Sequence, residues 1–336
     1  MKPGFSGWIL FCALALSAMV AERAWPAPTL DGKLTYTSTA SSNVPSPASI
    51  AVYVPPGYDA SRKQPYPLLI QLHGGLGTDK KMDMMSVWLE EAIEKGLVPP
   101  MVSVMPSAGR SFYMNYRDGS QKWETFITTE LLSYMRTHYN VVKGREGTFI
   151  TGISMGGMGS LRIAFKHPGL FQAVASQEPG IEPALSYDDI KLRDRFWRTD
   201  KLYEKIYGNP VDKNWWATNN PANIAKVDPA RLLGLGIYLE VGDQDMFYLD
   251  QGSEFLHRIL FDAGISHEYR LVKGADHAGA SLQPRFLDAM AFIGRQISPP
   301  DWIDKQAQST RKLLNKMKIR AGYPVTPFDP DRIHAK

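Results

Sequence analysis

The chain has 336 residues and a mass of 37.6 kDa, enough for one large α/β domain or two small ones. Hydrophobic residues make up 44% and charged residues 21%, which excludes disorder for the bulk of the chain. The net charge is +4. Residues 301–336 account for all of it, with eight Lys/Arg against four Asp, so residues 1–300 have no net charge. Because nucleic-acid-binding proteins carry strongly basic surfaces, we expect no nucleic-acid partner.

The N-terminus has the pattern of a secretory signal. Lys2 precedes an uncharged apolar stretch from Trp8 to Ala21, which is shorter than the roughly 20 apolar residues of a membrane-spanning helix. We expect residues 1–27 to be a signal peptide with an open cleavage point, and the mature protein to be periplasmic or secreted without a stable membrane span. An uncleaved anchor is the alternative. Cys12, the only cysteine, lies in this segment, so the mature chain has no disulfide, thiol nucleophile or cysteine-bound zinc.

Apolar runs and helical periodicity alternate along the rest of the chain. The predicted strands are 33–37, 50–54, 68–72, 102–105, 148–153, 173–176, 237–241 and 268–272. The predicted helices are 83–95, 124–138, 155–167, 251–263 and 284–296. This alternation is typical of an α/β fold with a mostly parallel central sheet and helices on both faces. We expect one α/β catalytic domain over residues 30–298.

Two regions depart from the alternation. Residues 180–232 lack a convincing strand and predict a small cap region. Its aromatic side chains either form a substrate platform or pack the cap against the domain. They are Trp197, Tyr203, Tyr207, Trp215 and Trp216. Residues 299–336 predict a basic C-terminal helix and tail, in which Asp301 caps a helix that runs to Arg320. This helix either packs peripherally or contacts anionic envelope material.

The strongest chemical signal is Gly152-Ile153-Ser154-Met155-Gly156, between a predicted strand and a predicted helix. In a nucleophile elbow the serine occupies a sharp turn between these two elements, and small neighbours permit the strained backbone. The alternative is a glycine-rich turn whose serine only caps the helix. The setting predicts that Ser154 is a nucleophile.

A serine hydroxyl needs a base, and the base needs an orienting carboxylate. In this fold both follow the serine in the chain, in the order acid and then histidine. His277 follows the last predicted strand and is the predicted base, whereas the other histidines lie in helices, in the tail, at a strand start or before the serine. Asp245 is the preferred acid, and the alternatives are Asp243 in the same turn and Glu178 after an earlier strand.

A glycine-rich loop, His73-Gly74-Gly75-Leu76-Gly77, follows the predicted strand 68–72. Glycines there let backbone N–H groups approach a carbonyl oxygen closely. The predicted oxyanion-hole donors are the N–H groups of Met155 and Gly75. A plain glycine-rich turn is the alternative, and a phosphate loop is excluded because no Gly-Lys-Ser/Thr follows.

Several motifs resemble those of the esterase D group of α/β-hydrolases and occur in the same order along the chain. This group includes S-formylglutathione hydrolases, feruloyl and acetylxylan esterases, enterochelin esterases and mycolyltransferases. They are Val52-Tyr53-Val54-Pro55-Pro56-Gly57-Tyr58, Leu72-His73-Gly74-Gly75, Gly152-Ile153-Ser154-Met155-Gly156-Gly157, Val241-Gly242-Asp243-Gln244-Asp245 and His277. The resemblance implies an α/β-hydrolase fold and ester hydrolysis through an acyl-enzyme, without metal or organic cofactor. Members often carry an aromatic residue after the catalytic histidine, whereas Ala278 follows here, so the resemblance leaves the shape of the acyl pocket open.

The leading functional hypothesis is a secreted or periplasmic serine esterase acting on a small-molecule or carbohydrate-linked ester, such as an acylated sugar or a hydroxycinnamoyl ester. One alternative is an acyltransferase with the same triad, and another is a non-catalytic envelope or carbohydrate-binding protein that uses the cap. A metal-assisted hydrolase built from His277 with Asp276, Asp243 or Asp245 is a further rival. We expect neither a metal nor a cofactor, since no H-x-H or H-E-x-x-H spacing occurs in the chain.

Overall fold

The computed structural model describes residues 30–195, 198–300 and 305–322. The chain divides into two units, Met1–Leu30 and Asp31–Lys336. All of the described residues except Leu30 belong to the second unit. The expected signal peptide and the capping residue Asp301 lie outside the described residues. Over the part of the chain that is described, no helix combines the length and apolar character needed to cross a membrane.

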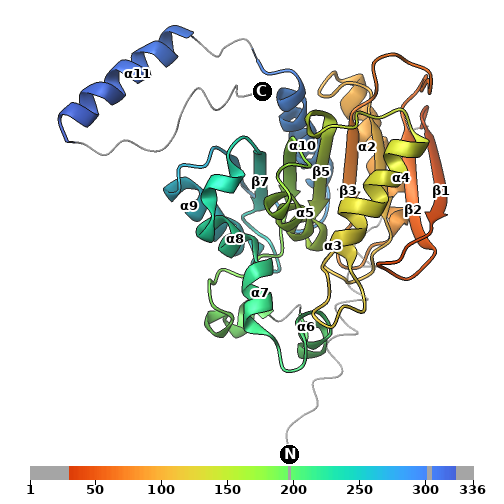
Figure 1. Cartoon of the computed structure of the whole chain (residues 1–336), viewed down its shortest axis with the longest axis horizontal. Helices are drawn as coiled ribbons and strands as arrows, with labels where there is room; N and C mark the ends of the chain where they lie inside the picture. The colour runs from red at the N-terminus through yellow and green to blue at the C-terminus, as the bar shows by residue number, and fades with distance from the viewer. Residues whose placement is uncertain (1–29, 196–197, 301–304, 323–336) are drawn as a thin grey trace, which may run out of the picture. The chain divides into compact units, whose positions relative to one another are not determined.

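An eight-stranded sheet lies at the centre of the second unit, in the order β1-β2-β4-β3-β5-β6-β7-β8 (Figure 1). Its strands are β1 Lys33–Thr39, β2 Ala48–Val54, β3 Leu68–Leu72, β4 Val102–Pro106, β5 Thr148–Ile153, β6 Ala173–Gln177, β7 Gly236–Gly242 and β8 Glu268–Val272. β2 is antiparallel to both β1 and β4, and each neighbouring pair from β4 to β8 is parallel. The mostly parallel sheet predicted from the sequence is therefore confirmed.

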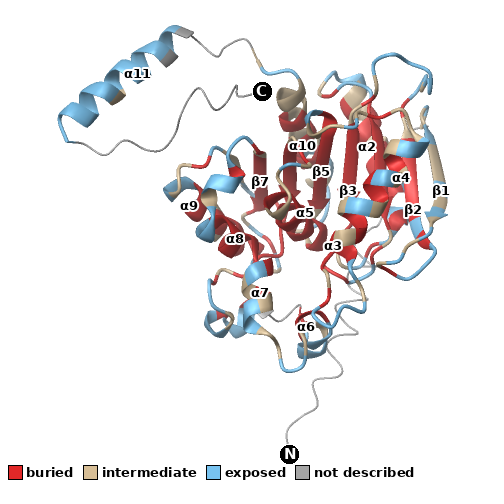
Figure 2. Cartoon of the chain, viewed as in Figure 1, coloured by how far each residue is buried: buried red, intermediate tan, exposed pale blue. Residues whose placement is uncertain are grey.

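Burial explains why the strands could be recognised. β3, β4 and β6 are buried along their whole length, and β5 except at its last residue, so they form continuous apolar or small-residue runs. The edge strands β1 and β8 have no fully buried residue, and apolar residues alternate with polar ones along most of each strand. Figure 2 shows β1 in the colours of intermediate and exposed residues.

Helices cover both faces of the sheet (Figure 1). The α-helices of the described residues are α2 Met82–Glu94, α3 Trp123–Thr125, α4 Leu132–His138, α5 Met155–Lys166, α6 Asp200–Tyr207, α7 Lys213–Asn219, α8 Pro221–Val227, α9 Leu249–Asp262, α10 Leu282–Ile297 and α11 Lys305–Arg320. α2 and α10 pack against each other on one face. On the other face α5 contacts β3, β5 and β6 and packs against α8, which in turn contacts α9.

The predicted helix over residues 124–138 is not a uniform α-helix. A π-helical segment, Phe126–Leu131, separates α3 from α4. The hydroxyl of Thr128 donates to the carbonyl of Glu124 at 2.9 Å, and that of Thr129 donates to the carbonyl of Thr125 at 2.7 Å. Such bonds compete with the regular backbone ladder, which explains why apolar periodicity alone did not predict the wider turn.

The predicted cap region lies between β6 and β7, and its described residues include no strand. Tyr203, Tyr207 and Trp216 are almost fully buried, at 1%, 2% and 0% exposure. The ring of Tyr187 lies 5.8 Å from that of Tyr203 and 5.9 Å from that of Trp216. These side chains therefore pack the segment onto the core. Of the two other predicted platform residues, Trp215 is half-buried and Trp197 lies outside the described residues.

Candidate active site

Ser154 occupies a strained turn between β5 and α5, with φ 59° and ψ −118°. A Cβ atom on Gly152 would lie 2.3 Å from the carbonyl oxygen of Gly156, so only glycine fits there. The N–H of Ser154 donates to the carbonyl of Gln177 at 2.9 Å, and the N–H of Gly180 donates to the carbonyl of Ser154 at 3.2 Å. These contacts fix the turn from both sides and leave the side chain half-buried at the carboxyl edge of the sheet.

His277 and Asp245 reach Ser154 from the loops that follow β8 and β7. The hydroxyl of Ser154 lies 3.1 Å from Nε2 of His277, and Nδ1 of His277 lies 2.8 Å from Oδ2 of Asp245. The other carboxylate oxygen of Asp245 accepts from the N–H groups of Phe247 at 2.7 Å and Leu249 at 3.3 Å. The carboxylate is thus fixed by its own loop, and it holds the ring in the tautomer with Nδ1 protonated and Nε2 free to accept from the serine.

The two neighbouring aspartates brace these loops. Oδ1 of Asp243 accepts from the N–H of Gly274 at 2.7 Å, which ties the acid loop to the histidine loop. Oδ1 of Asp276 accepts from the N–H groups of Met246 at 3.0 Å and His277 at 2.6 Å. Among the described residues, it is the carboxylate of Asp245 that contacts the imidazole ring, at 2.8 Å.

Glu178, the third acid candidate, lies near the site but is committed to other partners. Its Oε1 accepts from the N–H of Gly242 at 3.2 Å and from the guanidinium of Arg285 on α10. Arg285 also binds both carboxylate oxygens of Glu240, at 2.7 and 2.8 Å, and the carbonyl of Asp276 at 3.0 Å. One buried cation therefore joins β7 to the loops that follow β6 and β8. Sequence reasoning missed Arg285, because an arginine in an amphipathic helix ordinarily faces water.

The glycine-rich loop after β3 is held by His73. The N–H of Ala108 donates to Nε2 of His73 at 3.1 Å, so Nδ1 carries the proton and donates to the carbonyl of Gly74 at 2.8 Å. Burial lowers the pKa of His73, which keeps the ring neutral as these bonds require. The hydroxyl of Tyr113 donates to the carbonyl of the same histidine at 3.0 Å. His73 therefore positions the glycine-rich loop, a role that the sequence did not predict.

This loop lies against the elbow. A Cβ atom built on Gly75 would be 3.9 Å from the Cβ atom of Met155. Within the described residues, neither the N–H of Gly75 nor that of Met155 has an internal hydrogen-bond acceptor. Met155 is also the first residue of α5, where the helix dipole favours negative charge. The structure thus brings both predicted donors to the side of Ser154.

The family model named Esterase matches residues 41–290. The chain belongs to the Esterase family. Esterase MT1326 of Mycobacterium tuberculosis (strain CDC 1551 / Oshkosh) is 30% identical over 262 residues, which cover 73% of this chain and 56% of the relative. An acetyl esterase of Caldicellulosiruptor saccharolyticus is 35% identical over 63 residues, 19% of this chain and 24% of the relative. The chain therefore spans about half the length of the mycobacterial relative.

Two solved structures of known enzymes share the fold. A ferulic acid esterase has a TM-score of 0.64 at 22% identity, covering 80% of this chain and 100% of that chain. An S-formylglutathione hydrolase from Agrobacterium tumefaciens has a TM-score of 0.65 at 21% identity, covering 80% and 97%. At such identities the likeness concerns the fold alone, and it confirms the α/β-hydrolase fold that the sequence predicted.

In this member of the Esterase family, one cluster offers donor atoms of the kind that bind metals. One ligand atom each from Glu178, Asp245 and His277 lies within 4.8 Å of the others. Glu178 is paired with the Arg285 cation, and Asp245 is bonded to the imidazole that a metal would need. The donor set thus contains a single imidazole, which already binds Asp245, and it lies beside the positive charge of Arg285. It therefore does not fit the pattern of catalytic zinc, which has three protein ligands. The cluster shares His277 and Asp245 with the predicted metal rival, but its third member is Glu178 rather than Asp276 or Asp243.

Apolar side chains border the site of this esterase-family chain. The ring of Phe247 meets that of His277 edge-on, with centroids 4.6 Å apart and planes at 79°. Leu76 on the glycine-rich loop is 81% exposed, and Met246 and Tyr248 on the acid loop are 44% and 50% exposed. The sequence did not predict this apolar rim, although Leu76 adjoins Gly75 and Met246 adjoins Asp245.

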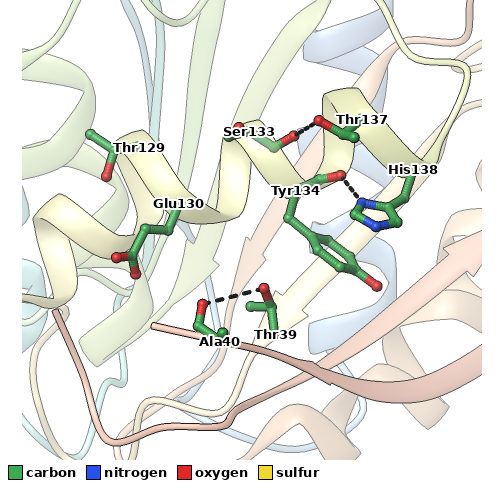
Figure 3. A pocket seen from close by; sticks show the side chains of 8 residues that line it. All are labelled: Thr39, Ala40, Thr129, Glu130, Ser133, Tyr134, Thr137 and His138. Carbon is green, nitrogen blue, oxygen red and sulfur yellow. Dashed lines mark hydrogen bonds between the residues drawn. The ribbon is translucent and has the colours of Figure 1, made fainter. Parts of the chain in front are cut away.

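A separate pocket of about 490 Å³ lies between the end of β1 and the helix containing α4 (Figure 3). None of the predicted catalytic residues lines it. Its polar groups are largely committed, since Glu130 accepts from Ser41, Ser42 and Asn43, and Nδ1 of His138 lies 2.9 Å from the carbonyl of Tyr134. This surface hollow has no connection with the chemistry at Ser154.

Proposed function

We propose that the protein is a serine carboxylic ester hydrolase that acts through an acyl-enzyme on Ser154. The observation that carries this proposal is the chain of contacts from the Ser154 hydroxyl to His277 and from His277 to Asp245, at 3.1 and 2.8 Å. A serine, a histidine and a buried carboxylate in this order form the general arrangement for activating a hydroxyl nucleophile. Membership of the Esterase family supports the same reaction.

In the proposed reaction the Ser154 oxygen attacks the ester carbonyl while Nε2 of His277 takes the hydroxyl proton. The imidazolium that forms is stabilised by Asp245 and then protonates the leaving alkoxide. Water next attacks the acyl-enzyme with His277 as base, and Ser154 regains its proton as the acid leaves. The N–H groups of Met155 and Gly75 stabilise the negative oxygen of both tetrahedral intermediates.

We infer that the acyl group is small or aromatic and that the alcohol belongs to a small molecule or a carbohydrate. The apolar rim of Leu76, Met246 and Tyr248, with Phe247 beside the base, supports an aromatic acyl group such as a hydroxycinnamoyl group. The names of the similar proteins, an acetyl esterase and a ferulic acid esterase, support the same range.

We also propose that the protein is periplasmic or secreted. Lys2 and the apolar stretch from Trp8 to Ala21 support this location, because together they have the pattern of a secretory signal. Cell fractionation followed by mass spectrometry of the mature N-terminus tests it. A cytoplasmic protein that retains residues 1–27 would refute this part of the proposal.

The activity is tested by a hydrolysis screen over acetyl, butyryl, longer acyl and feruloyl esters, with Ser154→Ala as the matched variant. Loss of Ser154 leaves only the roughly 10³ to 10⁴-fold catalysis over water that binding and the oxyanion hole supply. A fluorophosphonate probe should label Ser154 in the wild type and nothing in the variant. Full turnover by a pure Ser154→Ala protein would overturn the proposal.

The same assay tests the metal rival. Turnover is expected to be unchanged by excess EDTA and dialysis, because the proposed mechanism uses only a hydroxyl, an imidazole, a carboxylate and backbone N–H groups. Activity that disappears on chelation and returns with one stoichiometric metal ion would favour the Glu178, Asp245 and His277 cluster as a metal centre.

A further inference from the structure

The helix α11, Lys305–Arg320, combines cations with exposed apolar side chains. Its sequence contains six Lys/Arg and no Asp or Glu. Leu313, Leu314 and Met317 are 59%, 48% and 56% exposed, and Ile319 is 64% exposed. Large apolar side chains at such exposure, in a strongly cationic helix, form a surface that neither the fold nor the proposed chemistry uses.

Three of the four exposed large apolar residues of α11 lie on one side of the helix. At about 100° per residue, Leu313, Leu314 and Met317 fall with Gln306, Ala307 and Thr310 within about 120° of arc. Cations border this arc on both sides, and they are Lys316 and Arg320 on one flank and Arg311 and Lys318 on the other. Ile319 lies on the opposite side.

We propose that α11 binds the surface of a membrane rich in anionic phospholipid, with Leu313, Leu314 and Met317 inserted between the headgroups. A helix with an apolar face flanked by Lys/Arg lies in the plane of the interface, where burial of apolar side chains and attraction to anionic lipid add together. Charge complementarity identifies the occupant, because the helix carries six Lys/Arg and no Asp or Glu and so has a high positive charge. A soluble polyanion would use the cations but leave the apolar arc in water.

The helix is long enough to lie in an interface but not to cross a bilayer. Its 16 residues extend about 24 Å as an α-helix, which is shorter than the bilayer core. Lys and Arg side chains also recur along the sequence from Arg311 to Arg320. Attachment is therefore peripheral and weakened by salt. The candidate active site lies at the carboxyl edge of the sheet and shares no residue with α11, so binding and ester hydrolysis can be measured separately.

The test is co-sedimentation of the full chain with vesicles of phosphatidylglycerol and phosphatidylcholine, compared with phosphatidylcholine alone. We expect binding only to the anionic vesicles, and a decrease as salt rises. Leu314→Glu and Ile319→Glu each lower the net charge by one, but only the first changes the apolar arc. Leu314→Glu should therefore bind at least about tenfold more weakly than Ile319→Glu.

Both variants should keep the wild-type thermal midpoint and wild-type turnover of a soluble ester. A lower midpoint for Leu314→Glu alone would mean that the apolar arc packs against this chain, and it would overturn the proposal. Equal binding of the two variants to anionic vesicles would show that the apolar arc is not used, and would make α11 a polyanion site instead. Binding to neutral vesicles as strong as to anionic vesicles would contradict the role of the cations.

Discussion

The carboxylate of Asp245 lies 2.8 Å from Nδ1 of His277. Asp243, two residues earlier in the same turn, instead accepts from the backbone of Gly274 at 2.7 Å. The two aspartates of this turn therefore have different roles, because Asp245 faces the imidazole and Asp243 faces the neighbouring loop.

Exchange of these two carboxylates for amides should separate their roles. Asp245→Asn should lower kcat by about 10⁴-fold, because an amide does not hold the imidazole in the required tautomer or stabilise its charged form. Asp243→Asn should change kcat by less than about tenfold, because it weakens a loop contact only. The assay is hydrolysis of p-nitrophenyl acetate by both purified variants. The reverse ranking would make Asp243 the acid, and small losses in both would point to Glu178.

Substitutions at Gly75 test the oxyanion hole. Gly75→Pro removes the N–H that we propose as a donor, and the expected loss in kcat is about 10² to 10³-fold. Gly75→Ala is the matched control, because its Cβ atom would meet nothing closer than 3.9 Å and the N–H would remain. Stopped-flow measurement of the acylation step compares them. Equal rates for the two variants would remove Gly75 from the hole.

The strain at Ser154 predicts an unusual stability ranking. Its φ of 59° and ψ of −118° suit glycine better than any residue with a Cβ atom. Ser154→Gly should therefore be more stable than Ser154→Ala by about 1 kcal/mol, although glycine normally destabilises. Urea unfolding of the two inactive variants measures the difference. Greater stability of the alanine variant would mean that the turn relaxes when the hydroxyl is lost.

Glu124 should make the protein sensitive to acid. Burial raises the pKa of this carboxyl, but the hydrogen bond from His167 and the charges of Lys166 and Arg162 outweigh that effect and lower the pKa from 4.5 to about 2. Because the folded pKa is lower than the unfolded one, the stabilisation is complete above about pH 4.5 and is lost as the pH falls toward 2. It amounts to about 3 kcal/mol.

Urea unfolding of wild type and Glu124→Gln at pH 7 and pH 3 checks this expectation. The free energy of unfolding of the wild type should exceed that of Glu124→Gln by about 3 kcal/mol at pH 7 and by less than half of that at pH 3. Glu91→Gln is the control, since Glu91 forms a partly exposed i,i+4 pair with Lys95 that contributes about 0.5 kcal/mol or less. An advantage that stays constant between the two pH values would contradict the depressed pKa.

The sequence predicted the strands well because burial forces their composition. Leu68–Leu72 is buried at every residue, so five consecutive positions must be uncharged, and Gly152 is dictated by the 2.3 Å approach to Gly156. These are local constraints that a single chain reveals. They place Ser154 and His277 at strand ends on the same edge of a parallel sheet.

Other features depend on the tertiary structure and leave no local signal. Asp243 and Asp245 differ only in which loop each faces, and this is set by β8, about 30 residues away. Arg285 lies in an amphipathic helix, where an arginine ordinarily faces water, yet it is 2% exposed because Glu178 and Glu240 meet it from two other elements. Pairing across three segments cannot be read from any one of them.

The strandless segment between β6 and β7 divides the chain in a useful place. A break there, for example near Gly208, would leave Ser154 on one fragment and both Asp245 and His277 on the other. The two fragments would meet along the parallel pairing of β6 with β7, which joins Ala173 to Gly236 and Gln177 to Glu240. Under the proposed triad, each half alone should be inactive and hydrolysis by the pair would report their reassembly, which makes the fold a candidate for a split-enzyme sensor.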